Sequence, residues 1–424
     1  MHVKESRWQR LDNTATVFPV IANNSTTNVY RITASLNENI DGRLLQEALD
    51  RVLPRIPAFN VRLKKGLFWY YLESNHNKPP LVREENSYPC RFIDPKANNG
   101  FLFRVSYYQD RINLEVFHVL GDGMGGFNFL KELAYQYIRL AHIDKFSEAG
   151  DSLDVDTSLS TEDSFVKNYK HAEPNDYKSG RAVTVKGEKL LSGALGVMSG
   201  HMKVDQLKEA SKALDLSINE YLVSALAFAI YKGFLNGASS VYPISINVPV
   251  NLRPFFDSVT TRNFFVMVSA VFTPEKEKYN FEEVCNIIRD SLRKQITKEH
   301  LEKLFSYNVS NQKNIILRVV PFFIKKYALR LVYMKGAKAN TTTFTNLGVV
   351  KVNESYKQYI REFNAMIPPS AGQQIKAGVT SYNGVSTVTF TSVFRDTSIQ
   401  KEFFQLLASH GIDVTIETNG LFYH

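Results

Sequence analysis

Strand-type and helix-type patterns alternate along this chain, and they constrain its fold more than any other feature. In the first part, β-type alternation at 27–36 is followed by a predicted helix N-cap at Asp41. Strand patterns at 101–108 and 111–118 predict a hairpin. A polar stretch at 143–190 then interrupts the pattern. We interpret this stretch as a crossover or linker between two halves of the chain.

The second part has similar element content but no internal sequence repeat. Ser217 and Glu220 form a capping-box motif that opens a long apolar helix. Further strand patterns occur at 200–204, 240–250, 264–273, 341–347, 374–382, 385–394 and 413–417, and further helix patterns at 204–214, 281–298 and 398–410. A chain of 424 residues is too long for one ordinary core. We therefore predict an α/β fold, built as α+β two-layer sandwiches, with subdomains at 1–175 and 176–424.

The composition excludes several classes of protein. With 29 Phe and 21 Tyr, the chain is too aromatic to be disordered. Cys90 and Cys285 are too few for a disulfide framework and have the wrong spacing for a zinc site. The N-terminus has no apolar core of a signal peptide, and no apolar run is long enough to cross a bilayer. We expect a cytoplasmic protein without a bound metal.

Positive charge is concentrated in one region. The formal net charge is +9, and residues 303–353 contain no Asp or Glu. The basic residues of this region are Lys303, Lys313, Arg318, Lys325, Lys326, Arg330, Lys335, Lys338 and Lys351. Such a region suits a phosphate-bearing cofactor, an acidic carrier protein, a membrane surface or nucleic acid, and it is also compatible with a solvated face that has no partner. No nucleic-acid motif accompanies the charge, so we predict no nucleic-acid partner.

The most informative segment runs from Phe117 to Gly126, between a strand pattern and a helix pattern. Its glycines satisfy the G-x-G-x-x-G spacing of dinucleotide-binding loops. Asp122, however, would repel a pyrophosphate, and the acid with suitable spacing, Asp144, has no strand before it. We therefore disfavour nucleotide binding.

The same segment also contains His118-x-x-x-Asp122-Gly123 at the end of a predicted strand. An imidazole suits deprotonation of an alcohol or amine near neutral pH, and a glycine permits a sharp turn. The simpler interpretation is a structural histidine at a strand end, but the strand–turn–helix context favours a general base. The chain has no G-x-S-x-G, H-E-x-x-H or C-x-x-C motif that would indicate another chemistry.

Three segments give the chain a resemblance to the CoA-dependent acyltransferase superfamily, which includes chloramphenicol acetyltransferase, condensation domains, plant BAHD enzymes and alcohol acetyltransferases. They are His118 to Gly123, Asn247 to Pro254 (NVPVNLRP) and Thr343 to Gly348 (TFTNLG). The opening Arg10-Leu-Asp12-Asn13 is a weaker similarity. Within this superfamily, the chain most resembles the bacterial alcohol acetyltransferase-like branch. Phe117 stands where condensation domains usually have a second histidine, and the plant Asp-Phe-Gly-Trp-Gly segment is absent.

The resemblance implies two chloramphenicol-acetyltransferase-like subdomains with an active-site tunnel between them. His118 is then the general base, while Asp122 is structural, with Gly123 beside it and Arg253 as its expected partner. Thr345 or Asn346 is expected to line the site and donate a hydrogen bond to the oxyanion.

The implied reaction is transfer of an acyl group, such as acetyl, from acyl-CoA to the hydroxyl of an alcohol-type acceptor. Acyl-CoA is then a donor substrate rather than a permanent cofactor, and the basic residues Lys325, Lys326, Arg330 and Lys335 are candidates for binding its phosphates. The helix pattern around these cations is also compatible with peripheral membrane contact. The alternatives are an acyl carrier protein as donor, an amine as acceptor, and a non-catalytic binding module on the same fold.

Overall fold

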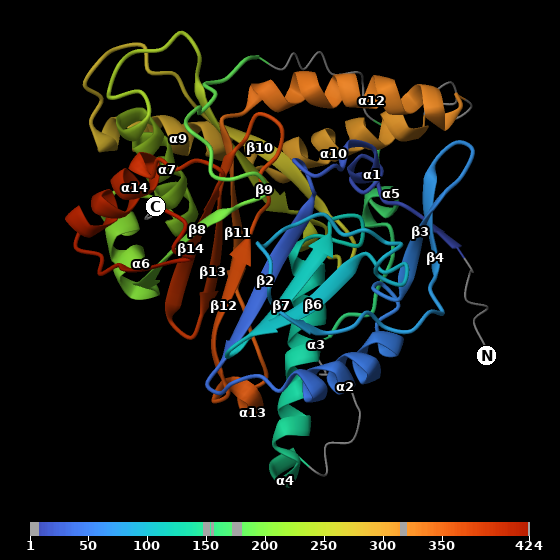
Figure 1. Ribbon diagram of the computed structural model, residues 1–424. Coiled ribbons are helices and arrows are strands. Elements are labelled where there is room, and N and C mark those ends of the chain that lie inside the picture. Colours follow the sequence, from blue (N-terminus) through green and yellow to red (C-terminus); the bar gives the residue numbers. More distant parts are fainter. Residues whose placement is uncertain (1–7, 147–152, 154–156, 172–179, 314–319, 423–424) are drawn as a thin grey trace.

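A computed structural model describes residues 8–146, 153, 157–171, 180–313 and 320–422 of the chain (Figure 1). Two large mixed sheets form the centres of two halves. The predicted α/β class with two sheet-based halves is confirmed. Each half has its own hydrophobic core, and the sheets face each other across a polar layer described below.

The first half is built on a five-stranded sheet. Across the sheet the strands are β12 (Ile360–Met366), β2 (Val29–Leu36), β7 (Arg111–Phe117), β6 (Phe103–Tyr108) and β5 (Arg83–Glu84). Helices α2 (Gly42–Val52) and α3 (Gly123–Ala141) cover one face, as Figure 1 shows. The predicted Asp41 cap is confirmed, because its carboxylate accepts hydrogen bonds from the first turn of α2. The predicted β6–β7 hairpin is also present.

The second half is built on a seven-stranded sheet. Its strands, in order, are β10 (Phe265–Phe272), β9 (Ile244–Asn251), β11 (Thr342–Val349), β13 (Ile375–Tyr382), β14 (Val385–Ser392), β8 (Gly196–Lys203) and β15 (Thr415–Thr418). Its helices are α6 (Val204–Ala213), α7 (Ile218–Gly233), α9 (Phe281–Gln295) and α14 (Ser398–Ser409). The capping box predicted at Ser217 and Glu220 is present. Strand β8 begins at Gly196, four residues before the predicted start, because it pairs with β14 along its whole length. The absence of a Cβ at Gly196 and Gly200 leaves room for the rings of Phe422 and Phe404.

Strand β12 joins the halves, and no sequence pattern predicted it. It follows α13 (Glu354–Lys357) late in the chain, yet it pairs antiparallel with β2 of the first half. Figure 1 shows it between β2 and β13. Three threonines of the second sheet fix it from the other side. Their hydroxyls donate to it or to the residue that follows: Thr380 to Phe363 O at 2.7 Å, Thr389 to Asn364 Oδ1 at 2.6 Å and Thr391 to Ile367 O at 2.6 Å.

The facing surfaces of the two sheets are polar because their strands alternate. In β2, Tyr30, Ile32, Ala34 and Leu36 enter the first core, whereas Arg31, Thr33 and Ser35 point to the opposite side. In β13, Ala377 and Val379 enter the second core. Lys376 and Thr380 are therefore on the face turned to the first half.

A smaller layer lies at the end of the molecule that carries α12 in Figure 1. It contains the sheet β1 (Trp8–Arg10), β4 (Tyr70–Ser74) and β3 (Val61–Lys65), together with α1 (Phe18–Ile21), α10 (Lys298–Lys313) and α12 (Phe322–Gly336). Val20, Ile21 and Phe322 form a small core that joins α1 to α12. Short helices α4 (Ile143–Phe146), α5 (Ser164–Lys167) and α8 (Arg253–Phe256) complete the described α-helices, with 3-10 turns at Leu53–Arg55 and Ala337–Ala339.

No single helix in the described ranges is long and apolar enough to cross a membrane. Only α6 and α7 taken together have the length and composition of a candidate membrane span, and they are bent by 78° relative to each other.

The boundary predicted at 175/176 stays a prediction. Residues 172–179 and part of the 143–190 linker lie outside the described residues. Residues 360–366, which follow the predicted boundary, nevertheless form a strand of the five-stranded sheet in the first half.

Candidate functional site

His118 lies where β7 ends and the chain turns toward α3. Its backbone N–H donates to Asn28 O at 2.9 Å, which continues the pairing of β2 and β7 by one residue. Four residues later Asp122 is the N-cap of α3, and its Oδ1 accepts from Met124 N and Gly125 N at 3.2 Å each. The strand end and the helix start therefore fix the tight loop that carries His118.

Asp122 also pairs with Arg253, the partner that the resemblance implied. The guanidinium makes two bonds to the carboxylate, Nη1 to Oδ2 at 2.9 Å and Nη2 to Oδ1 at 3.0 Å. Phe264 N donates to the same Oδ2 at 3.0 Å. Arg253 follows β9 and further donates to the carbonyls of Thr260 and Arg262. This pair therefore connects the His118 loop of the first half to the second half.

The glycines of the loop allow close packing against the protein's own chain. A Cβ at Gly121 would lie 2.4 Å from Thr261 O, and one at Gly125 would lie 2.0 Å from the same oxygen. A Cβ at Gly123 would meet the Leu347 side chain at 2.4 Å. The glycine spacing that matches a dinucleotide-binding loop therefore allows the two halves of the molecule to pack closely here.

Asn263 fixes the orientation of the His118 ring. His118 Nδ1 lies 2.9 Å from Asn263 Oδ1. The Asn263 amide nitrogen donates to Asp12 Oδ2 at 3.0 Å and to His118 O at 3.2 Å. Because both of these partners are acceptors, the amide presents its oxygen to the ring, and Nδ1 carries the proton. Nε2 is then the basic nitrogen, and the described residues offer it no hydrogen bond from another side chain.

The surroundings of His118 keep the imidazole neutral. Phe18 stacks on the ring with centroids 4.6 Å apart, and Phe265 lies at 5.8 Å. Burial lowers the pKa of His118 below its usual value, and the nearby charge of Lys376 acts in the same direction. Asp122 and Asn263 oppose this effect. Desolvation dominates, so the ring is a free base at neutral pH.

His118 lines a cavity of about 220 Å³ between the two halves. β2, the His118 loop, β9, β10, β11 and the end of β12 all contribute to its wall. Thr345 and Asn346 line it as well. Asn346 uses its carbonyl to accept from Gly348 N at 2.8 Å, and its amide nitrogen lies 3.4 Å from Asn219 Oδ1. The Thr345 hydroxyl has no hydrogen bond in the described structure and is the better-placed donor of the two.

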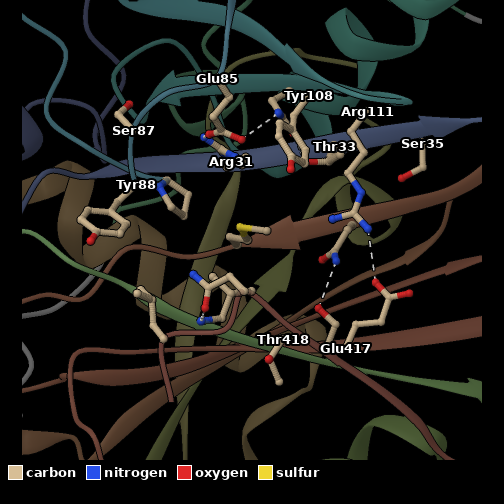
Figure 2. A pocket seen from close by; sticks show the side chains of 18 of the residues that line it. Arg31, Thr33, Ser35, Glu85, Ser87, Tyr88, Tyr108, Arg111, Glu417 and Thr418 are labelled. Atoms are coloured by element: carbon tan, nitrogen blue, oxygen red, sulfur yellow. Dashed lines mark hydrogen bonds and ion pairs between the residues drawn. The ribbon is translucent and has the colours of Figure 1, made fainter. Parts of the chain in front are cut away.

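A second, more polar cavity of about 800 Å³ adjoins the first and shares Arg31 and Met366 in its wall. Figure 2 shows the strand that carries Arg31, Thr33 and Ser35 on one side of it and Glu417 on the other. Arg111 of β7 donates to Glu417 of β15 at 3.2 Å across this cavity. Two adjoining cavities therefore lie between the halves, where the sequence analysis expected a tunnel.

The four cations proposed to bind CoA phosphates lie on α12 and do not line the His118 cavity. Lys325 is buried, with Nζ 4.0 Å from the centre of the Trp69 ring and 3.3 Å from Phe68 O. Arg330 Nε donates to Val20 O at 2.8 Å. Lys326 is half-buried, and Lys335 is exposed. Phosphate binding by these residues stays a prediction.

Sequence reasoning missed two residues of the site. Asn263 follows a run of polar residues with no motif, and its role depends on a contact between residues 145 positions apart. Lys376 lies in a strand whose alternation indicated only a half-polar face. Asp12 was noted as part of the N-terminal resemblance, and its position behind Asn263 shows what that segment contributes.

Comparison with known proteins shows similarity of fold at low sequence identity. No protein-family profile matches the sequence, and no curated protein does. The structure resembles polyketide synthase associated protein 5 from Mycobacterium tuberculosis, with TM-score 0.62, 15% identity and coverage of 96% of this chain and 98% of that one.

Two fungal proteins give further matches. For TRI3 trichothecene 15-O-acetyltransferase from Fusarium sporotrichioides, the TM-score is 0.59, the identity 12% and the coverage 95% and 97%. For TRI101 from the same fungus, complexed with coenzyme A and T-2, the corresponding values are 0.60, 11%, 95% and 97%. Condensation domains also match. This chain therefore has the two-subdomain fold of the chloramphenicol acetyltransferase-like CoA-dependent acyltransferases and condensation domains.

Proposed function

We propose that the chain is an acyltransferase that moves an acyl group from acyl-CoA to the hydroxyl of an alcohol-type acceptor. The observation that carries this proposal is the state of His118, whose Nδ1 is fixed by Asn263 while the ring lines a cavity between the halves. The similarity of fold to an O-acetyltransferase and to a protein bound to coenzyme A supports the same reaction class.

The reaction needs no covalent enzyme intermediate. His118 Nε2 accepts the proton of the acceptor hydroxyl as its oxygen attacks the thioester carbonyl. The carbonyl π electrons move to oxygen, and the Thr345 hydroxyl is the candidate donor to this oxyanion. When the tetrahedral intermediate collapses, the carbon–sulfur bond breaks and the CoA thiolate takes the proton from the His118 imidazolium. The products are an ester and free CoA thiol, and His118 is again neutral.

The direct test is thiol release from a panel of acyl-CoAs with mixed alcohols and amines. We expect acceptor-dependent release that His118→Ala reduces by about 10² to 10⁴-fold, the usual contribution of a general base. His76→Ala is the matched control, because this histidine is exposed and does not line the cavity. Equal thermal stability of the two variants would show that the loss is chemical.

The other outcomes separate the alternatives. Release that survives His118→Ala contradicts the proposed role of His118. Release only with amines changes the acceptor class. If no acyl-CoA supports release, the panel is repeated with acylated carrier protein, and failure there as well favours a binding module on this fold.

We further infer that α12 contacts an anionic membrane surface that supplies a lipid or long-chain substrate. Large apolar side chains of this helix are exposed: Phe323, Ile324, Tyr327, Leu331, Val332 and Met334. Soluble proteins rarely expose a contiguous patch of this kind. The helix lies in the region 303–353, which has basic but no acidic residues, so the surrounding charge complements acidic headgroups.

Vesicle sedimentation tests this contact. We expect binding to vesicles that contain phosphatidylserine, weaker binding to phosphatidylcholine alone, and loss of binding in the triple variant Tyr327→Ser, Leu331→Ser, Val332→Ser. The matched control is Leu81→Ser, Leu191→Ser, Val241→Ser, which removes three exposed apolar side chains elsewhere. Unchanged sedimentation of the α12 variant overturns the inference, as does a wild-type dimer in solution that the α12 variant converts to monomer.

A further inference from the structure

A buried cation without a carboxylate partner lies in the wall of the His118 cavity. Lys376 is on β13, on the face turned toward the first half, and is only 8% exposed. Its ammonium group has no hydrogen bond and no ion pair with any described residue. Burial lowers the pKa of its ammonium group to about 8, and no carboxylate opposes this effect.

The other cations that line this cavity are already neutralised. Arg31 pairs with Glu85 and Glu115, and Arg253 makes its two bonds to Asp122. Lys376 therefore supplies an uncompensated positive charge to the cavity. A buried charge is unfavourable unless a partner is present, so the missing counter-ion is expected from a ligand.

The position of Lys376 relates this charge to the reaction. In the pairing of β11 with β13, Phe344 is opposite Ala377, so Thr343 and Lys376 are neighbours on the cavity side. The Thr343 hydroxyl is already used, because it donates to Gln373 Oε1 at 2.6 Å. The charge of Lys376 also lowers the pKa of His118, so the two groups interact through the same cavity. An anion bound to Lys376 would therefore lie in the same cavity as the base.

We propose that Lys376 binds a carboxylate of the substrate, so that this site acts on acid-bearing molecules. The inference rests on the acyltransferase function proposed above and names its substrate class. A single ammonium in a cavity of about 220 Å³ suits a singly charged carboxylate better than the doubly charged group of a phosphate monoester. The carboxylate has two sources, namely a hydroxy acid as acceptor or a dicarboxylic acyl group such as malonyl or succinyl on the donor.

The kinetic test compares substrates that differ only in this charge. One arm pairs malonyl-CoA and succinyl-CoA with propionyl-CoA and butyryl-CoA on a neutral alcohol. The other arm uses acetyl-CoA and pairs hydroxy acids with their methyl esters. We expect the wild type to prefer the acid in one arm, and Lys376→Met to lower the acid-to-neutral ratio of kcat/KM by about tenfold or more, mainly through KM. Lys376→Arg is expected to retain part of the preference.

Lys203→Met is the matched control, because it removes the same charge from an exposed position on β8. A preference for acids that Lys376→Met leaves intact overturns the inference, and so does the absence of any preference in both arms. Titration of the protein with succinate and with succinamide keeps the test separate from catalysis. If no substrate pair releases thiol, the proposed function fails. The carboxylate site is then tested by binding alone: succinate binding that requires Lys376 supports the site, and succinate binding that does not require Lys376, or no binding, contradicts it.

Discussion

At the scale of the residue, the described structure orients His118 through a neutral amide. Asn263 holds Nδ1–H and is itself held by Asp12, whose pKa burial raises to about 6 although Arg262 opposes that rise. A carboxylate in place of Asn263 would raise the pKa of the ring more strongly and would face Asp12. The amide therefore selects the tautomer while leaving the ring a weak, neutral base.

The variant Asn263→Ala should show how much of the rate depends on the orientation of the His118 ring, because the imidazole itself is retained. We expect kcat at neutral pH to fall by about tenfold to a hundredfold, because the required tautomer and ring position are no longer held. The hydrogen bond to Asn263 raises the pKa of His118, so its loss lowers that pKa further. The acid limb of the rate profile, which already lies below pH 6.5, should move to still lower pH. A variant that only loses folded protein would show reduced rates with an unmoved acid limb.

Lys376 should reduce the stability of the unliganded protein. Its pKa is about 8 in the folded state and 10.5 when unfolded, which corresponds to a cost of about 3 kcal/mol at pH 7, where both states are protonated. The cost disappears as pH rises from 8 to 10.5, because the unfolded state then holds the extra proton. Lys376→Met should therefore be the more stable protein at pH 7, and its advantage over wild type in urea unfolding should shrink by pH 10. An equal difference at both values would contradict this account.

At the scale of the element, the five residues 121–125 at the start of α3 have three structural roles. Asp122 caps the helix and binds Arg253, while Gly121 and Gly125 let the segment that contains Thr261 approach. A side chain at either glycine would move the segment that contains Asn263 two residues later. Packing at the helix start and orientation of the base are thus coupled.

Gly125→Ala tests this coupling. Its Cβ would be 2.0 Å from a backbone oxygen, which cannot move aside as a flexible side chain can. We expect a loss of about 1–3 kcal/mol in the free energy of unfolding, together with reduced thiol release. Gly336→Ala is the control, because that helical position has open space around it and alanine favours helices. Similar stability of the two variants would show that the loop is not as constrained as the contact implies.

Elements with strong local signals could be predicted from the sequence. Asp41 and Ser217 start helices by local capping, and the β6–β7 hairpin follows alternation on either side of a short turn. Strand β12 could not be predicted, because it is stabilised by a partner more than 300 positions away in the chain. The residues of the candidate site also divide into those that the sequence could predict and those that it could not. His118, Asp122 and Arg253 belong to local motifs, whereas Asn263 and Lys376 acquire their roles only from contacts between the halves.

At the scale of the whole molecule, the site belongs to neither half alone. The base comes from the first half, while its orienting amide, the Asp122 partner and the lysine of the cavity come from the second. The polar layer between the sheets leaves room for two adjoining cavities, and β12 keeps those sheets in register. Relative motion of the halves would therefore disturb pairing within the first sheet as well as the site.

This arrangement predicts a single cooperative unfolding transition. A fragment of residues 1–175 lacks β12, so β2 would have an unpaired edge, and Asp122 would lose the partner of its buried charge, a loss of about 3–5 kcal/mol in similar pairs. We expect calorimetry of the full chain to give one peak whose van't Hoff and calorimetric enthalpies agree. The fragment should lack the near-ultraviolet circular dichroism of a packed core until residues 176–424 are added. Two separate peaks would instead mean that each core is stable without the other, and the boundary at 175/176 would then divide two independent folding units.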